Sequence, residues 1–159
     1  MIEIRVEAPD LPVIERWPPR LQWAIQRLIA REAEETARDF KTEMADQGLA
    51  ATSLIINSVK ADQVDEYNWR VGPHVEYARY VLEGRRPGGK LPPWRAIADW
   101  LKVKRLDSSP RAAWAVARAI RQRGIKGRDY VTPVVKRTRD RLAERAPAAI
   151  AEAMTGDVG

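Results

Sequence analysis

The chain has 159 residues, and its composition, 45% hydrophobic and 31% charged, is typical of one folded domain and not of a disordered segment. Cysteine is absent and His74 is the only histidine, which excludes disulfides, thiolate metal sites, cysteine nucleophiles and clusters of imidazole ligands. No run of about 18 apolar residues occurs, and the first residues show no basic segment followed by an apolar one. We therefore expect neither a membrane span nor a secretory signal, and a protein made in the cytoplasm.

The charges are distributed unevenly along the chain. Residues 1–79 carry 10 Lys and Arg against 14 Asp and Glu, a net charge of −4. Residues 80–159 carry 18 and 8, a net charge of +10. This division predicts that the basic half meets either nucleic acid or the acidic half of a neighbouring identical subunit, and the sequence leaves both possibilities open.

The first part of the chain is predicted to form a strand and then a long helix. Apolar and charged side chains alternate in residues 2–6, which indicates a short strand with one wet face. Prolines between Pro9 and Pro19 indicate an extended connector that carries Trp17. Residues 20–46 have the spacing of one helix, and its buried stripe is expected to consist of Leu21, Ala24, Ile25, Leu28, Ala33, Ala37, Phe40 and Met44.

A β-hairpin is expected after this helix. Residues 53–60 are rich in β-branched side chains, and residues 61–63 are expected to supply the turn. Residues 64–72 alternate cleanly, so that Tyr67, Trp69 and Val71 share one face and polar side chains share the other. The Gly72-Pro73 pair ends the second strand.

The second half of the chain is predicted to be mainly helical. The buried face of a helix at 93–104 is expected to hold Trp94, Ile97, Trp100 and Leu101. A helix at 110–123, capped by Ser109 and closed by Gly124, is expected to turn three side chains inward: Trp114, Ala117 and Ile120. A last helix runs to about Met154, with a kink expected at Pro147.

The segments between these helices are less regular. Residues 75–82 are ambiguous between helix and strand. Residues 84–90 and 124–128 are two basic loops, and the proline and glycines of the first are expected to exclude regular structure.

Together the elements predict an α+β fold, a small antiparallel sheet packed by one long N-terminal helix and about three shorter C-terminal helices. Residues 1–159 are expected to form a single domain. Within it, residues 1–19 are a strand and proline-rich connector, residues 20–154 the folded core, and residues 155–159 a loose tail.

No set of residues indicates catalysis. His74 follows a strand exit and has Glu76 two residues on, and a triad with Ser58 could be drawn. However, no nucleophile elbow surrounds any serine, and a triad is recognised by its geometry. A surface or hydrogen-bonding histidine is the favoured interpretation, so we expect no enzymatic activity.

Cation and phosphate sites are also not indicated. Asp62, Asp65 and Glu66 lie in and beside the expected hairpin turn, where turn chemistry explains them better than a divalent cation. The loop at 84–90 contains glycines and cations, but Lys90 is followed by Leu91-Pro92-Pro93 and not by the helix that a P-loop requires. We expect no cofactor and no metal.

Two sets of residues are candidates for contacts with partners. The basic side chains of the two loops could contact DNA phosphates or a partner protein: Arg85, Arg86, Lys90, Arg123, Lys126 and Arg128. Trp17 and Trp23 lie in and beside the proline connector and are candidates for a subunit interface, where tryptophan is enriched.

The basic helix at 110–123 offers a third kind of contact. Its exposed side is expected to hold Arg111, Arg118, Arg121 and Arg123. The connection before it is longer than that of a helix-turn-helix pair, and no Asn or Gln side chains crowd one face. Sequence-specific reading of DNA is therefore not favoured.

One segment, Tyr77-Ala78-Arg79-Tyr80-Val81-Leu82-Glu83-Gly84, resembles the tyrosine–alanine and glutamate–glycine signature of the tail-component family of long-tailed phages. The motif residues are Tyr77, Ala78, Glu83 and Gly84. The order of the other elements agrees with that family over roughly residues 20–145. Members resemble minor virion proteins used for head–tail joining or tail completion.

The resemblance implies a structural, non-enzymatic virion protein. It implies a homo-oligomeric ring, expected to be a hexamer, around the DNA channel of the phage neck. Its partners would be copies of itself and the neighbouring neck and tail-tube proteins, with non-specific contact to genomic DNA and none to a membrane. Two alternatives rest on the residues alone: a basic DNA-binding module, and, with the least support, a hydrolase that uses His74.

Overall fold

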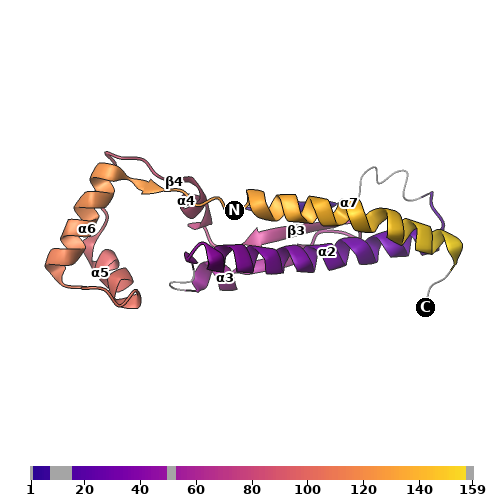
Figure 1. Ribbon diagram of the computed structural model, residues 1–159, viewed down its shortest axis with the longest axis horizontal. Helices are drawn as coiled ribbons and strands as arrows, with labels where there is room; N and C mark the ends of the chain where they lie inside the picture. The colour runs from indigo at the N-terminus through magenta and orange to yellow at the C-terminus, as the bar shows by residue number, and fades with distance from the viewer. Residues whose placement is uncertain (1, 8–15, 50–52, 157–159) are drawn as a thin grey trace.

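The computed structural model describes residues 2–7, 16–49 and 53–156. An elongated body is built around two long helices, and a smaller helical arm projects from one end of it (Figure 1). Helices dominate, and the strands form a small antiparallel sheet, so the predicted α+β fold is confirmed. Of the expected connector, Pro9 and Pro12 lie outside the described residues.

The two long helices of the body run side by side in opposite directions (Figure 1). Helix α2 spans Pro19–Asp46, about 42 Å at 1.5 Å per residue, and its expected buried stripe is largely confirmed. Helix α7 spans Thr132–Thr155 and continues through Pro147. Pro147 lies on the exposed side of α7.

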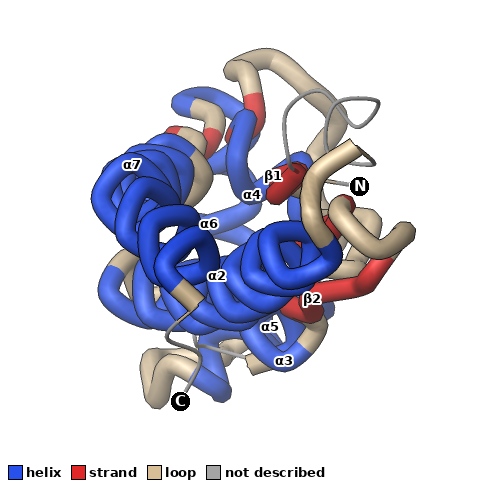
Figure 2. The backbone as a smooth tube through the Cα atoms, turned by 90° about the vertical axis from the view of Figure 1, so that its right-hand side faces the viewer, coloured by secondary structure: helices blue, strands red, loops and turns tan. Residues whose placement is uncertain are grey.

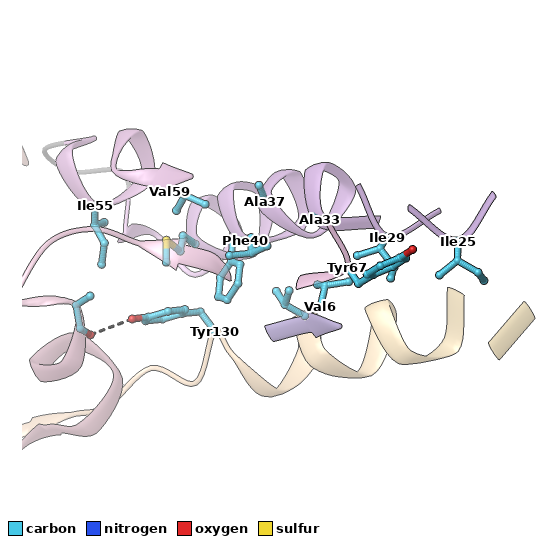
Figure 3. Close-up of a cluster of buried hydrophobic side chains, with 14 residues drawn as sticks. Val6, Ile25, Ile29, Ala33, Ala37, Phe40, Ile55, Val59, Tyr67 and Tyr130 are labelled. Carbon is cyan, nitrogen blue, oxygen red and sulfur yellow. Dashed lines mark hydrogen bonds between the residues drawn. The ribbon is translucent and has the colours of Figure 1, made fainter. Parts of the chain in front are cut away.

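The sheet has three antiparallel strands in the order β1-β3-β2. These are β1 at Ile4–Glu7, β2 at Val59–Gln63 and β3 at Asn68–Pro73. One face of the sheet packs against α2, and Figure 2, which looks along the long helices, shows the strands beside them. Val6 and Val59 lie in this buried layer with Phe40 of α2 (Figure 3), and Val71 belongs to the same buried cluster. Of the three side chains predicted to share one face, Tyr67 and Val71 are buried and Trp69 is partly buried.

The hairpin differs from its prediction at both ends of β2. Residues predicted as the start of a strand form a short helix, α3, at Leu54–Asn57, and the predicted turn at 61–63 belongs to β2. The chain turns four residues later because the Asp65 carboxylate accepts hydrogen bonds from the backbone N–H of Tyr67, at 2.9 Å, and from the Asn68 amide. The N–H bond also lowers the pKa of Asp65 below its ordinary value.

A buried charge joins α2 to α7. Glu32 is fully buried, and its carboxylate accepts hydrogen bonds from Arg141 Nε at 3.0 Å and Arg145 Nη1 at 2.5 Å. One turn along, the hydroxyls of Thr36 and Thr138 lie 2.8 Å apart, also buried. A buried carboxylate is tolerated when cations and hydrogen bonds compensate for its lost hydration.

Further ion pairs extend this contact along the two helices. They join Glu35 to Arg145 and Arg141, Asp39 to Arg141, and Glu43 to Arg137. The basic half of the chain was expected to meet nucleic acid or the acidic half of a neighbouring subunit. Many of the charges on α2 and α7 are instead paired within the chain, because the antiparallel packing sets the acidic side of α2 against the arginines of α7.

Candidate functional site

The chain leaves the body and returns to it through a short two-stranded ribbon. Helix α4, at Ala78–Glu83, leads into β4 at Gly84–Arg85, which pairs antiparallel with β5 at Ile125–Lys126. The two predicted basic loops therefore meet, and the expectation that the first has no regular structure is wrong for its first two residues. Residues 84–127 are called the arm below.

Two glycines allow the ribbon to form. Gly84 has φ +74°, and a Cβ there would lie 2.3 Å from the backbone nitrogen of Gly127 and from the carbonyl oxygen of Ile125. Gly124 directly follows a helix at Pro110–Arg123. It has φ +73°, and a Cβ added there would lie 2.2 Å from the carbonyl oxygen of Arg85. Any other residue at either position would need the backbone to move.

The base of the arm is fixed to the core of the body by Tyr130. Its phenol donates a hydrogen bond of 2.9 Å to the carbonyl oxygen of Ala78, and its ring meets that of Phe40 edge-on (Figure 3). Burial raises the pKa of Tyr130 to about 12. The backbone N–H of Arg128 donates to the carbonyl oxygen of Val81 at 3.0 Å.

The four motif residues lie around the base of the arm and have different structural roles. Ala78 is fully buried and accepts the Tyr130 hydrogen bond, while Gly84 begins the ribbon. Glu83 accepts a 2.7 Å hydrogen bond from Arg79 Nε at the surface, and Tyr77 is exposed. The motif therefore marks where the arm joins the body. Tyr130, which completes the junction, is 52 residues away from Ala78 and was not predicted.

The arm beyond the ribbon is a pair of helices. Helix α5 spans Trp94–Val103, and α6 spans Pro110–Arg123. As predicted, Ser109 caps α6, its hydroxyl accepting a 3.3 Å hydrogen bond from the backbone N–H of Ala112. Within the described part of the chain, α5 and α6 make their extensive contacts only with each other. Their small core contains Ala98, Leu101 and Ala113, and Ala117 of α6 is also buried.

Two tryptophans predicted to be buried lie at the surface of the arm. Trp100 is 42% exposed and Trp114 is 40% exposed, whereas Trp94 packs partly against the small core. The prediction assumed that both helices pack against a larger core. A pair of helices buries only the side chains between them, so the flanking tryptophans keep much of their surface in water.

The net positive charge of the protein is concentrated in the arm. Residues 84–127 hold 12 Lys and Arg against 2 Asp and Glu, a net charge of +10, while all other residues hold 16 against 20, a net charge of −4. Asp99 lies 3.5 Å from Lys102. Asp107 accepts the backbone N–H of Ser109 at 2.9 Å, which lowers its pKa. The remaining cations of the arm thus have few anionic neighbours.

The six basic residues predicted as partner contacts divide into two groups. Arg85 and Arg128 use their guanidinium groups within the chain, donating to the carbonyl oxygens of Lys90 and Gln47 respectively. The other four are exposed, and none forms an ion pair with a residue that the structure describes: Arg86, Lys90, Arg123 and Lys126.

The two tryptophans predicted at a subunit interface have different surroundings. Trp17 is partly buried against the core of its own body. Trp23 is 47% exposed, and the Arg27 guanidinium lies 4.4 Å from the centre of its ring. Trp23 also lines an open pocket of about 360 Å³ between the start of α2 and the end of α7.

His74 pairs with a different carboxylate from the one expected. Its Nε2 lies 2.8 Å from Asp62 Oδ2 on the neighbouring strand. The Ser58 hydroxyl donates to the carbonyl oxygen of Ile55 at 2.7 Å and not to His74. The geometry of a serine–histidine pair is therefore missing from these residues, and a cross-strand surface pair describes them.

Comparison with known proteins identifies no relative of this chain. Neither protein-family models, nor curated proteins, nor solved structures give a match to the chain. Among the described residues, no group of three or more acidic or histidine side chains is placed to hold a metal ion. No helix in that part of the chain is both long and apolar enough to cross a bilayer.

Proposed function

We propose that this protein is an oligomeric structural subunit of a tailed-phage virion, acting in head–tail joining or tail completion. In this proposal the arm of one copy docks on the body of the next copy. The observation that carries it is the arm, which is set apart from the body, opposite to it in net charge, and apolar on part of its surface. The resemblance of residues 77–84 to the tail-component family supports the place in the virion.

The apolar part of the arm lies on α5 and just beyond it. Trp100 and Val103 are three residues apart and lie on neighbouring positions of one helix side, and Leu106 follows the end of α5. All three are exposed, Val103 and Leu106 by more than half. Large apolar side chains in contact with water, on a projecting element, are typical of surfaces that become buried in an assembly.

The body of a second copy is the favoured occupant of this surface. It has a net charge of −4 against the +10 of the arm, so the long-range attraction between arm and body is favourable. Arm and body are different surfaces, and repeated contacts between two different surfaces produce a ring when the rotation closes. The ring of six that the family resemblance implies would meet this requirement.

Light scattering during gel filtration tests the assembly. The full chain should elute with the mass of several 18.0 kDa subunits. Replacing two apolar arm residues, Trp100→Glu with Leu106→Glu, should reduce the mass to that of one chain. The matched control, Trp114→Glu with Ile125→Glu, makes the same charge change at exposed apolar positions of the arm outside this surface and should leave the assembly intact.

The virion assignment has a separate test. Mass spectrometry of purified particles of the phage that encodes the chain should detect it in a constant ratio to the tail-tube protein. A protein that forms rings in solution but is missing from such particles would contradict the virion role and leave the assembly standing.

A further inference from the structure

One side of α6 carries three arginines and a tryptophan in line. They follow one another at intervals of three, four and three residues, which places them on one helix face: Arg111, Trp114, Arg118 and Arg121. All four are exposed, while Ala113 of α6 is buried in the small core that α6 forms with α5. This face, called the α6 face below, therefore points away from the rest of the arm.

The α6 face has no neutralising acid. Helix α6 contains neither Asp nor Glu, and none of its three arginines on this face pairs with a carboxylate among the described residues. From Arg111 to Arg121 the face is about 15 Å long. By contrast, Arg137, Arg141 and Arg145 of α7 all bind carboxylates of α2. Unpaired guanidinium groups in a row are suited to phosphate oxygens.

We propose that the α6 face binds duplex DNA through its phosphates, without reading the base sequence. Long-range attraction to a polyanion follows from the +10 charge of the arm, and the three arginines supply the direct contacts. Gln122 is the one amide side chain of α6, so direct base reading by a row of Asn or Gln has no basis here.

Duplex DNA is favoured over a single strand by the shape of the site. Binding of single strands uses a groove with several aromatic side chains on which successive bases stack. The α6 face is the convex side of one helix, and Trp114 is its only aromatic residue. Trp114 is therefore expected to pack against a sugar edge and to contribute less than the arginines.

This inference is independent of the proposed assembly, because it uses α6 and not the apolar surface of α5. The DNA contact is thus assigned to other residues than the loop residues predicted from the sequence. Two of those, Arg85 and Arg128, donate their side-chain hydrogen bonds to backbone carbonyl oxygens within the chain. Alanine is the best helix former, so replacing the arginines of the α6 face by alanine should preserve the helix.

Fluorescence anisotropy with a labelled duplex of arbitrary sequence, about 20 base pairs long, measures the binding between about 50 and 200 mM salt. The triple variant Arg111→Ala, Arg118→Ala and Arg121→Ala should bind at least about tenfold more weakly than the unchanged chain, with the slope of log K against log salt reduced by about 3. A scrambled duplex should bind equally well. The triple variant should keep the mass of the unchanged chain in light scattering.

The matched control removes three exposed arginines from the body, Arg20→Ala, Arg38→Ala and Arg139→Ala, and has the same net charge as the arm variant. It should keep nearly all of the affinity. Equal weakening by the two triple variants would overturn the proposal, since only net charge would then matter. Tighter binding of a single strand of the same length, abolished by Trp114→Ala, would overturn the choice of duplex. Loss of self-association in Trp114→Ala, with DNA binding unchanged, would make the α6 face a protein interface.

Discussion

Tyr130 and Ala78, 52 residues apart, are joined by a buried hydrogen bond of 2.9 Å from the phenol to the backbone carbonyl oxygen. Ala78 begins α4, just before the arm, and Tyr130 follows β5, just after it. The bond therefore closes the loop of chain from which the arm projects. The Tyr130 side chain is one of the contacts that hold the arm in place relative to the body, together with the ribbon and the bonds of Arg128.

Removing the phenol tests this junction. Tyr130→Phe should lower the free energy of unfolding by about 1 kcal/mol, because a buried hydrogen bond to the Ala78 carbonyl oxygen is lost. Tyr80→Phe, at a tyrosine of α4 that is 72% exposed, should change it by less than about 0.5 kcal/mol. Urea unfolding followed by circular dichroism measures both. Equal stabilities of the two variants would show that the Tyr130 bond contributes nothing.

The ribbon glycine Gly84 should be intolerant of any side chain. Gly84→Ala adds a methyl group 2.3 Å from the backbone of β5 and keeps an unfavourable positive φ. Gly88 also has a positive φ, of +82°, but a Cβ there meets no atom within 4 Å. Gly88→Ala should therefore show the conformational cost alone, about 1 kcal/mol, and Gly84→Ala clearly more. Thermal unfolding of the pair separates the two costs.

Because Glu32 is buried between the long helices and Glu34 is exposed, replacing each by alanine should change the free energy of unfolding by different amounts. Glu32→Ala leaves Arg141 and Arg145 without their buried partner and should lower the free energy of unfolding by about 3 kcal/mol. Glu34→Ala, at an exposed position of α2, should change it by less than about 0.5 kcal/mol. Urea titration gives both values. A Glu32→Ala protein as stable as Glu34→Ala would mean that the network adds no stability.

The pH dependence of stability should follow from the same contact. Burial acts to raise the pKa of Glu35, but hydrogen bonds from Arg145 and Arg31 outweigh it and hold the pKa below its ordinary value of 4.5. The folded state thus favours the ionised carboxylate. Its contribution is present above that ordinary value and is lost as the pH falls through the lower pKa of the folded state.

Comparison with a neutral side chain isolates this contribution. Between about pH 5 and pH 3, Glu35→Gln should lose less stability than the unchanged chain, since it has no proton to take up at this site. Urea midpoints measured at steps across this range give the two curves. Parallel curves would show that the ionisation of Glu35 is not linked to folding.

Regular periodicity of the apolar residues made α2 and the sheet predictable. The hairpin turn and the burial of the arm tryptophans could not be predicted in this way. The apolar stripe of α2 packs on one large partner, so the pattern directly reports its buried face. The hairpin turn was misplaced because the acceptor role of Asp65 outweighs the β-branched pattern around it. The pattern of α5 shows which side of the helix is apolar but not how much of that side another element covers. In the structure Trp100 stays 42% exposed.

The ion pairs between α2 and α7 had a signal that was overlooked. Four acids recur on α2 with helical spacing and three arginines recur on α7 every four residues: Glu32, Glu35, Asp39 and Glu43, with Arg137, Arg141 and Arg145. Matching stripes of opposite charge predict that two helices pack together. Only the fold, however, shows that they belong to the same chain and run antiparallel, which is why the charge asymmetry was assigned to partners outside the chain.

Docking of the arm on a neighbouring body is tested most directly by a chain without the arm. Residues 86–124 are replaced by Asn-Gly, which joins Arg85 to Ile125 across the ribbon as a two-residue hairpin turn. By light scattering, this chain alone should have the mass of one subunit. Mixed with the unchanged protein, it should enter complexes as a terminal subunit and shorten them, because its body can accept an arm and it has none to give. An armless chain that assembles like the unchanged protein would contradict the account, as would a full-length chain that stays at 18.0 kDa at every concentration.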